Sequence, residues 1–145
     1  MFPVLAKELM RNVILEHVAA EDAINPARVV ETYSANAPIF EDVAAGVHCV
    51  GGEEIIAEYR GVWDGFPKLS RNVTRWTFGE DSVVIEVTVS GKHEGFFRDI
   101  PPTSKEVTLR GIAHFQFDSE GRIKKETVYY DSLTLLRQLG IIQTG

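Results

Sequence analysis

The sequence predicts an α+β domain in which a curved antiparallel sheet wraps around N-terminal helices and encloses a pocket. In the first third, apolar residues recur every three to four positions, as in amphipathic helices. After Pro67 they recur every second position, as in half-buried strands. The chain has 145 residues and shows no repeat, linker or low-complexity tract. We therefore expect residues 1–145 to form one cone-shaped domain closed by its helices.

Two helices are predicted before residue 35. The apolar stripe of the first, which His17 and Glu21 continue, consists of Leu5, Leu9, Val13, Ile14 and Val18. Asn25-Pro26 predicts the start of the second, because Asn can cap a helix and Pro suits its first position. Its expected inner face is Val29, Val30 and Tyr33.

A third helix is expected to start at Gly51–Glu54, with acidic residues at its positive N-terminal end. It should end near Pro67. Its predicted inner stripe is Ile55, Tyr59, Val62, Trp63 and Phe66.

The strands follow from alternation and turn residues. A short strand pair is expected within Ile39–Val50, and Arg71–Phe78 should form a hairpin with the strand Val83–Val89. A strand at Val107–Phe117 then turns at Asp118–Gly121 into another, Arg122–Tyr130. Asp131 or Ser132 is predicted to cap a last helix that ends at Gly140.

Composition excludes several classes of protein. The net charge of −6 comes from 15 Lys and Arg against 21 Asp and Glu, and no basic stripe for nucleic acid is visible. The single cysteine, Cys49, allows no intrachain disulfide. Charged residues interrupt Met1–Leu15, and no apolar run reaches the roughly 20 residues of a membrane span. We expect a cytoplasmic protein that binds neither nucleic acid nor membrane.

A pocket is predicted where small residues interrupt the sheet. Gly111 and Ala113 lie mid-strand where bulk is expected, which leaves room for another group to approach. Aromatic side chains could line this space for a flat apolar ring system, although they could equally be core. They are Tyr33, Tyr59, Trp63, Phe66, Phe97 and Tyr129.

Two segments resemble one family. Gly91–Phe97 followed by Ile100–Lys105 resembles the G-T-H-x-G-x-F … I-P-P-T-G-K segment of SnoaL-like polyketide cyclases, also described as ester cyclases. The C-terminal third, from Phe115 to Gly140, is similar to theirs as well. The resemblance implies the nuclear-transport-factor-like cone fold, a pocket for a small hydrophobic molecule, and a homodimer or homotetramer.

The resemblance also identifies a departure. In these cyclases the acid/base pair comes from two adjacent strands, and the matching positions here are Ala113 and Thr127. Neither side chain exchanges a proton near neutral pH. This argues against carrying the family's mechanism over unchanged.

His17 and Asp42 are candidate catalytic residues. His17 matches the oxyanion-donor tyrosine of the similar steroid isomerases, and Glu21 could orient it one turn later. Each could instead be an ordinary residue of the core edge or surface. Tyr33 to Asp42 resembles the segment with the isomerases' carboxylate, and one extra residue makes Glu41 and Asp42 alternatives, with Asp42 favoured.

His93 is the third candidate. It lies between Gly91 and Gly95, which can aim its side chain inward, and an imidazole can act as acid or base at neutral pH. A hairpin histidine bonded to the backbone is the structural alternative. His114 and Glu126 alternate away from Phe115 and are expected to face outward or into a subunit interface.

Two functions remain. One is a cofactor-independent cyclase or isomerase of a polyketide- or steroid-like ketone, with His93 or Asp42 as base and His17 stabilising the enolate. The other is a non-catalytic binding module for a small hydrophobic ligand. No cofactor is expected, because no glycine-rich nucleotide loop follows a strand. No metal is expected either, because no set of residues has clear metal-ligand spacing.

Overall fold

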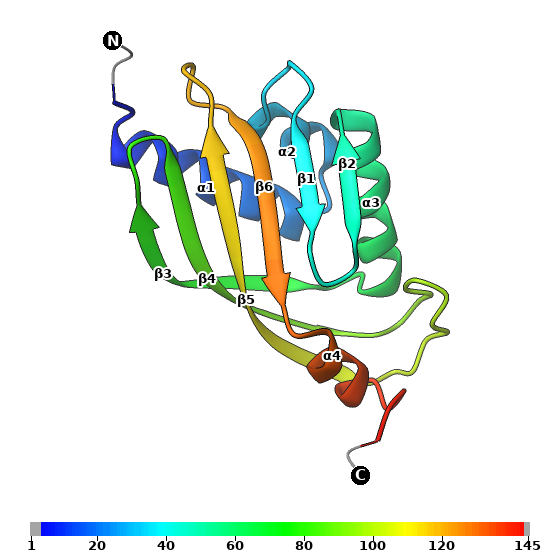
Figure 1. Ribbon diagram of the computed structural model, residues 1–145. Helices are drawn as coiled ribbons and strands as arrows, with labels where there is room; N and C mark the ends of the chain where they lie inside the picture. Colours follow the sequence, from blue (N-terminus) through cyan, green and yellow to red (C-terminus); the bar gives the residue numbers. More distant parts are fainter. Residues whose placement is uncertain (1–3, 144–145) are drawn as a thin grey trace.

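A computed structural model describes residues 4–143 as four helices packed against one six-stranded sheet (Figure 1). The helices are α1 (Lys7–Asp22), α2 (Pro26–Thr32), α3 (Gly52–Gly65) and α4 (Ser132–Gln138). The strands are β1 (Ile39–Asp42), β2 (Val47–Val50), β3 (Ser70–Phe78), β4 (Ser82–Lys92), β5 (Glu106–Phe117) and β6 (Ile123–Tyr130). The predicted elements therefore all form.

The sheet has the strand order β2-β1-β6-β5-β4-β3 and is not closed into a barrel. Figure 1 shows α1, α2 and α3 on one side of this curved sheet, with α4 at the lower end of β5 and β6. The α+β class and the curved sheet under N-terminal helices are confirmed. The β1–β6 pair is parallel, so the sheet is mixed rather than wholly antiparallel. The other four neighbouring pairs are antiparallel.

The buried face of α1 matches the predicted stripe in part. Ile14, His17 and Glu21 are buried as predicted, together with Met10 and Ala20, whereas Leu9 is 42% exposed. The buried residues keep the helical spacing of three to four. Two polar residues are thus carried into the interior together.

The second helix starts as predicted, because the Asn25 side chain accepts the backbone N–H of Arg28 at 3.2 Å. Val29 and Tyr33 are buried as expected. Val30 is 39% exposed, so its assignment to the inner face was wrong. The polar residue Thr32 is buried in its place.

The segment His93–Lys105, which we call the strap, joins β4 to β5 beside the end of α3 (Figure 1). Gly95 makes this close approach possible, because a Cβ there would lie 2.0 Å from the Asp64 carbonyl oxygen. The backbone N–H groups of Glu94 and Gly95 both donate to the Gly65 carbonyl. The strap is therefore fixed to α3.

A register shift in the β5–β6 pair decides which side chains of β6 face the helices. Phe117 pairs with Ile123, yet Gln116 pairs with Lys125, so β6 carries one extra residue at Lys124. Beyond the shift, Phe115 pairs with Glu126 and the two side chains share a face. A one-residue shift reverses the face of every following side chain. Glu126 therefore points inward.

The interior contains two apolar clusters. The larger lies under α1, α2 and α3 and includes Ile14, Ile55 and Phe115. The smaller lies under the strap and α4 and includes Phe66, Phe97 and Leu139. No helix within residues 4–143 is long and apolar enough to cross a membrane.

Candidate functional site

A cavity of about 190 Å³ lies between the sheet and the helices and borders both apolar clusters. Valine, leucine, isoleucine and phenylalanine form most of its wall. Gly111 and Ala113 both line it, at the position where the small residues of the sequence predicted free space. The cavity also has charged residues in its wall, and these gather in two places.

The inner polar cluster is built around His17, which is fully buried. It consists of His17, Glu21, Thr32, Tyr33, Tyr59, Arg71 and Glu126. His17 and Glu21 come from α1, Thr32 from α2, Tyr59 from α3, Arg71 from β3 and Glu126 from β6. Five segments of the chain therefore meet at this one buried place.

Both ring nitrogens of His17 have partners. The Thr32 hydroxyl donates to the Val29 carbonyl at 2.6 Å, so its oxygen is left to accept the His17 Nδ1–H at 2.8 Å. His17 Nε2 lies 2.6 Å from Oε1 of Glu21 and 3.2 Å from Oε1 of Glu126. Two carboxylate oxygens are acceptors only, so a proton on Nε2 is required. His17 is therefore an imidazolium.

The pKa values of His17 and Glu21 follow from this geometry. Burial alone lowers the pKa of His17, but the Glu21 and Glu126 carboxylates outweigh it and raise that pKa from 6.5 to about 10. Burial likewise raises the pKa of Glu21, and Arg71 and then His17 overcome this and lower it from 4.5 to about 2. Both residues are charged at neutral pH.

The two carboxylates differ in how far they are already bonded. Glu21 Oε2 contacts Nε of Arg71 at 2.5 Å, and its Oε1 accepts from Tyr59 at 2.8 Å as well as from His17. Glu126 Oε1 accepts from Tyr33 at 2.6 Å and lies 3.0 Å from the Tyr59 hydroxyl, whose single hydrogen is donated to the nearer Glu21. No residue in the described range 4–143 donates to Glu126 Oε2, and Glu126 lines the cavity. That oxygen is free to accept a proton from a bound molecule.

The charges of the inner cluster balance. His17 and Arg71 are positive, and Glu21 and Glu126 are negative. Arg71 also donates Nη1–H to Asp22 at 2.9 Å, at the more exposed end of α1. One ligand atom each of His17, Glu21 and Glu126 lies within 4.8 Å of the others, a spacing that could hold a metal ion. The two cations already neutralise the two carboxylates without one.

Asp42, a predicted catalytic residue, belongs to a second group of charges. Its side chain is buried in the cavity wall, whereas that of Glu41 contacts Lys125 and is not part of the wall. Asp42 Oδ2 accepts from the Tyr130 hydroxyl at 2.9 Å and Nη2 of Arg98 at 3.4 Å. Oδ1 accepts the backbone N–H of Ala45 at 2.9 Å. Both oxygens are thus occupied.

His93, the other predicted catalytic residue, is buried outside the cavity wall. Its Nδ1 accepts the backbone N–H of Thr103 at 3.2 Å and lies 3.0 Å from the Thr103 hydroxyl. Its ring stacks on Phe66 at 5.2 Å, and Nε2 has no hydrogen-bond partner within residues 4–143. The hairpin histidine bonded to the backbone, the alternative reading, describes this geometry.

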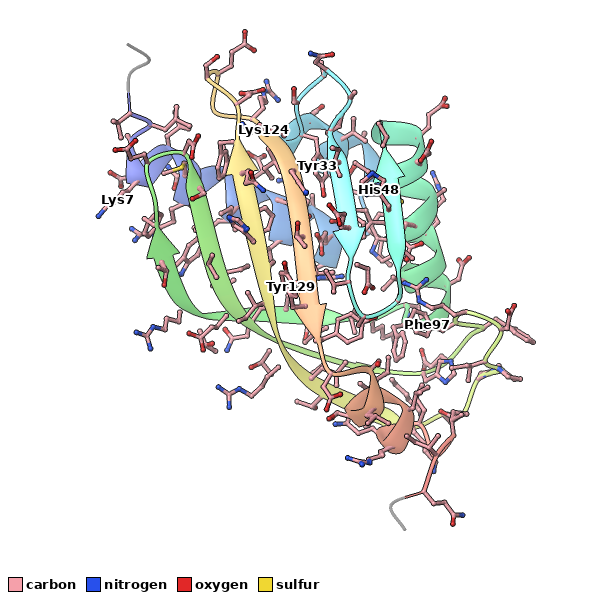
Figure 2. All side chains as sticks on the ribbon, viewed as in Figure 1. Lys7, Tyr33, His48, Phe97, Lys124 and Tyr129 are labelled. Atoms are coloured by element: carbon pink, nitrogen blue, oxygen red, sulfur yellow. The ribbon has the colours of Figure 1, made fainter. Side chains whose placement is uncertain are left out.

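Five of the six predicted aromatic residues divide into two groups. Tyr59, Phe66 and Phe97 line the cavity, the last from the strap near the end of α3 (Figure 2). Tyr33 is buried behind Glu126, and Trp63 stacks on Tyr59 at 5.8 Å while donating to the Glu21 carbonyl. These two support the wall from behind.

The comparisons with known proteins agree with this architecture. The family model for SnoaL-like polyketide cyclases matches residues 14–139. The chain belongs to this family. No curated protein matches the chain.

Solved structures show the same SnoaL-like fold at low sequence identity. A proposed SnoaL-like polyketide cyclase from Jannaschia sp. CCS1 is 19% identical, with a TM-score of 0.84 over 94% of each chain. AclR from Streptomyces galilaeus, a proposed hydroxylase, is 21% identical, with a TM-score of 0.81 over 95% of this chain and all of its own. A Catenulispora acidiphila protein with a ketosteroid isomerase-like fold, in complex with trimethylamine, is 19% identical. Its TM-score is 0.77 over 88% of this chain and 92% of its own. These likenesses show the fold.

The inward face of β6 is where the sequence analysis of this SnoaL-like chain failed. Thr127, taken as an acid/base position, pairs with His114 and faces away from the cavity, while Glu126 faces it. Tyr129 borders the cavity but pairs with Ile112 on the outer face and is 48% exposed (Figure 2). The misplacement of Thr127 and the expectation that Glu126 faces outward are the same one-residue phase error, caused by the extra residue at Lys124, whereas Tyr129 borders the cavity as predicted. Glu126 and Val128 are two residues apart and therefore lie on the same face of β6. Because Val128 is an apolar residue of the cavity wall, it was the signal in the sequence that Glu126 faces inward.

Proposed function

We propose that this protein is a cofactor-independent cyclase or isomerase of a hydrophobic polyketide- or steroid-like ketone, with Glu126 as the base. The observation that carries the proposal is the free Oε2 of Glu126 at the wall of an apolar cavity, backed by a neutral cluster of buried charges. This keeps the reaction class expected from the sequence. It moves the base from His93 or Asp42 to Glu126 and keeps His17 as a source of positive charge.

The first step is abstraction of a proton next to a carbonyl. The C–H bond breaks, its proton goes to Glu126 Oε2, and its electron pair forms the enolate. Glu126 is then neutral, so within the buried cluster His17 and Arg71 outnumber the one buried carboxylate left, Glu21, while Asp22, the other partner of Arg71, is partly exposed to solvent. The resulting net positive charge balances the negative enolate in a site of low polarity, where such attraction is strong.

The second step returns the proton. In an isomerisation Glu126 gives it to another carbon of the enolate. In a cyclisation the enolate carbon forms a C–C bond with a second carbonyl carbon, and the oxygen of that carbonyl takes the proton. Both routes return Glu126 to its charged state and need no oxidant or reductant.

Hydrogen exchange tests the base without knowledge of the substrate. Enolisation of α-tetralone, a flat bicyclic ketone, in D₂O replaces its α-hydrogens with deuterium, which NMR follows. We expect the protein to accelerate this exchange and Glu126→Gln to lower the acceleration by about 10²-fold or more. Glu86→Gln, on the outer face of β4, is the matched control. It should accelerate the exchange of α-tetralone as much as the wild type does. Equal rates for Glu126→Gln and wild type would remove Glu126 as the base.

The alternative is a non-catalytic binding module for a small hydrophobic ligand. Ala113 favours it, because that cavity position lacks the ionisable group expected of the family. A binding module would bind α-tetralone saturably and leave its exchange rate at the uncatalysed value. A small hydrophobic ligand is common to both proposals, as is the homodimer or homotetramer that the family resemblance implies.

A further inference from the structure

A second polar group lies at the rim of the cavity, apart from the inner cluster. It consists of Asp42, Glu58, Arg98 and Tyr130, all of which line the cavity. The side chains of Arg98 and Glu58 are 33% and 20% exposed, so this group is where the charged wall meets solvent. The proposed reaction uses none of the four.

The strap holds Arg98 in an unusual backbone conformation. Arg98 and Asp99 both have positive φ angles, 44° and 67°, which residues other than glycine seldom adopt. Reciprocal backbone hydrogen bonds between Phe97 and Ile100 close the turn at 3.0 and 2.8 Å. Such strain persists where the surroundings impose it, and it is frequent at ligand-binding positions. Here it places a guanidinium over the cavity.

Only part of the Arg98 guanidinium is occupied. Nη2 donates to Glu58 Oε1 at 2.5 Å and to Asp42 Oδ2 at 3.4 Å. Within residues 4–143, no acceptor contacts Nε or Nη1. The guanidinium also lies over the Phe97 ring, 5.1 Å from its centroid. Three N–H donors are therefore available at a partly dry, aromatic edge.

The local charge limits what these donors can bind. Two carboxylates, Asp42 and Glu58, surround the single cation, so a further anion would be repelled. Tyr130 adds no charge, because burial and then Asp42 raise the pKa of its hydroxyl. A neutral acceptor oxygen, such as that of a ketone, ester or amide, satisfies the free donors without adding charge.

The rim group lies at a defined offset from the base. On β1, Phe40 is opposite Glu126 and Asp42 is opposite Val128, two residues further along β6. Two residues of strand correspond to about 7 Å. A ligand that spans the cavity from Glu126 to the rim would thus present a second group to Arg98.

We propose that Arg98, held by Asp42 and Glu58, is a specificity-determining residue that binds a neutral carbonyl oxygen at the end of the ligand remote from Glu126. The ligand class is then a flat apolar molecule with an oxygen function at each end. This inference rests on the proposed function only in that the cavity takes up such a molecule. It does not require turnover.

Two probes of the same shape test it by calorimetry. One is 6-acetyl-2-naphthol, and the other is 6-isopropenyl-2-naphthol, in which a CH₂ group replaces the carbonyl oxygen. We expect the wild type to bind the acetyl compound roughly tenfold more tightly, as for one hydrogen bond from a charged donor. In Arg98→Met this preference disappears. Arg75→Met, an exposed arginine of β3, should retain it.

Three results would overturn the inference. Equal affinities of the two probes in the wild type would show that Arg98 does not bind the carbonyl oxygen, although the cavity still binds ring compounds. If Arg98→Met still preferred the acetyl compound, Arg98 would not bind its oxygen and would only stabilise the strap. Binding of neither probe to the wild type would remove this subsite together with the proposed ligand cavity. Loss of exchange activity in Glu126→Gln with the probe preference intact would separate the base from the subsite.

Discussion

His17 and His93 are equally buried and have opposite surroundings. Both are fully enclosed, and both contact a threonine hydroxyl through Nδ1. Around His17 two carboxylates converge on Nε2 in the cavity wall. Around His93 there is an aromatic face and a backbone N–H, and its Nε2 has no partner in the described part of the chain. One is a charged group beside a cavity, the other an anchor of the strap.

Acidic partners, rather than burial or a family motif, distinguish the charged His17 from His93. His93 lies in the glycine-flanked motif that resembles the family most clearly, and His17 lies in the amphipathic helix α1; the family model covers both residues. Desolvation disfavours a charged imidazole unless opposite charges compensate it. Glu21 and Glu126 provide that compensation only at His17.

The largest effect is expected from removing the His17 charge. His17→Phe keeps the ring volume but leaves Glu21 and Glu126 facing only Arg71, and an uncompensated buried charge costs about 4 kcal/mol of unfolding free energy. Urea denaturation at pH 7 measures it. Adding Glu21→Gln to His17→Phe restores neutrality and should recover part of the loss. If His17→Phe alone were as stable as the wild type, His17 would not form stabilising ion pairs with Glu21 and Glu126.

The matching substitution at the strap should cost less. His93→Phe keeps the stacking on Phe66 but leaves the Thr103 N–H without its acceptor, which costs about 2 kcal/mol. The α-tetralone exchange rate should not change, because His93 lies outside the cavity wall. A loss of exchange in the folded variant would return His93 to the list of catalytic candidates.

The pH dependence of stability separates the two histidines further. The folded-state pKa of His17 is raised to about 10, so its stabilisation is complete below pH 6.5 and is lost as the pH rises toward 10. The pKa of Glu21 is lowered to about 2, so its contribution is present above pH 4.5 and lost below. Between pH 7 and 9 the unfolding free energy should fall by up to about 1.4 kcal/mol per pH unit. The slope should vanish in His17→Phe and persist in His93→Phe.

The smallest effect on stability is expected at the cavity floor. Ala113→Val adds two methyl-sized groups to free space, so the unfolding free energy should change by less than about 1 kcal/mol. Affinity for a flat ring compound should fall, because the added groups occupy the same space. Calorimetry with 2-naphthol measures this. Unchanged affinity would show that ligands bind elsewhere.

The sequence predicted the elements well because their signals are local. Asn25-Pro26, the alternation around Ile85 and the turn at Gly121 each depend on neighbouring residues only. Gly111 and Ala113 likewise predicted the cavity, because small residues in a strand leave space whatever the partner strand is.

The inner cluster could not be assembled from the sequence, because it depends on register. The extra residue at Lys124 inverts β6, turning Glu126 inward and Thr127 outward, and the apolar Val128 two residues after Glu126 is a weak local sign of it. The pairing of Glu21 with Arg71 joins α1 to a distant strand. His17, by contrast, was placed correctly because helical spacing alone carries it to the buried face.

The most direct test of the charged cluster around His17 is an NMR pH titration of the His17 imidazole, assigned by comparison with His17→Phe. We predict that His17 stays protonated through pH 8 and titrates near pH 10, because Glu21 and Glu126 hold its proton. A midpoint at the ordinary value near 6.5 would show that the cluster is not a neutral set of four charges. The assignment of Glu126 as a base supported by His17 and Arg71 would then be wrong.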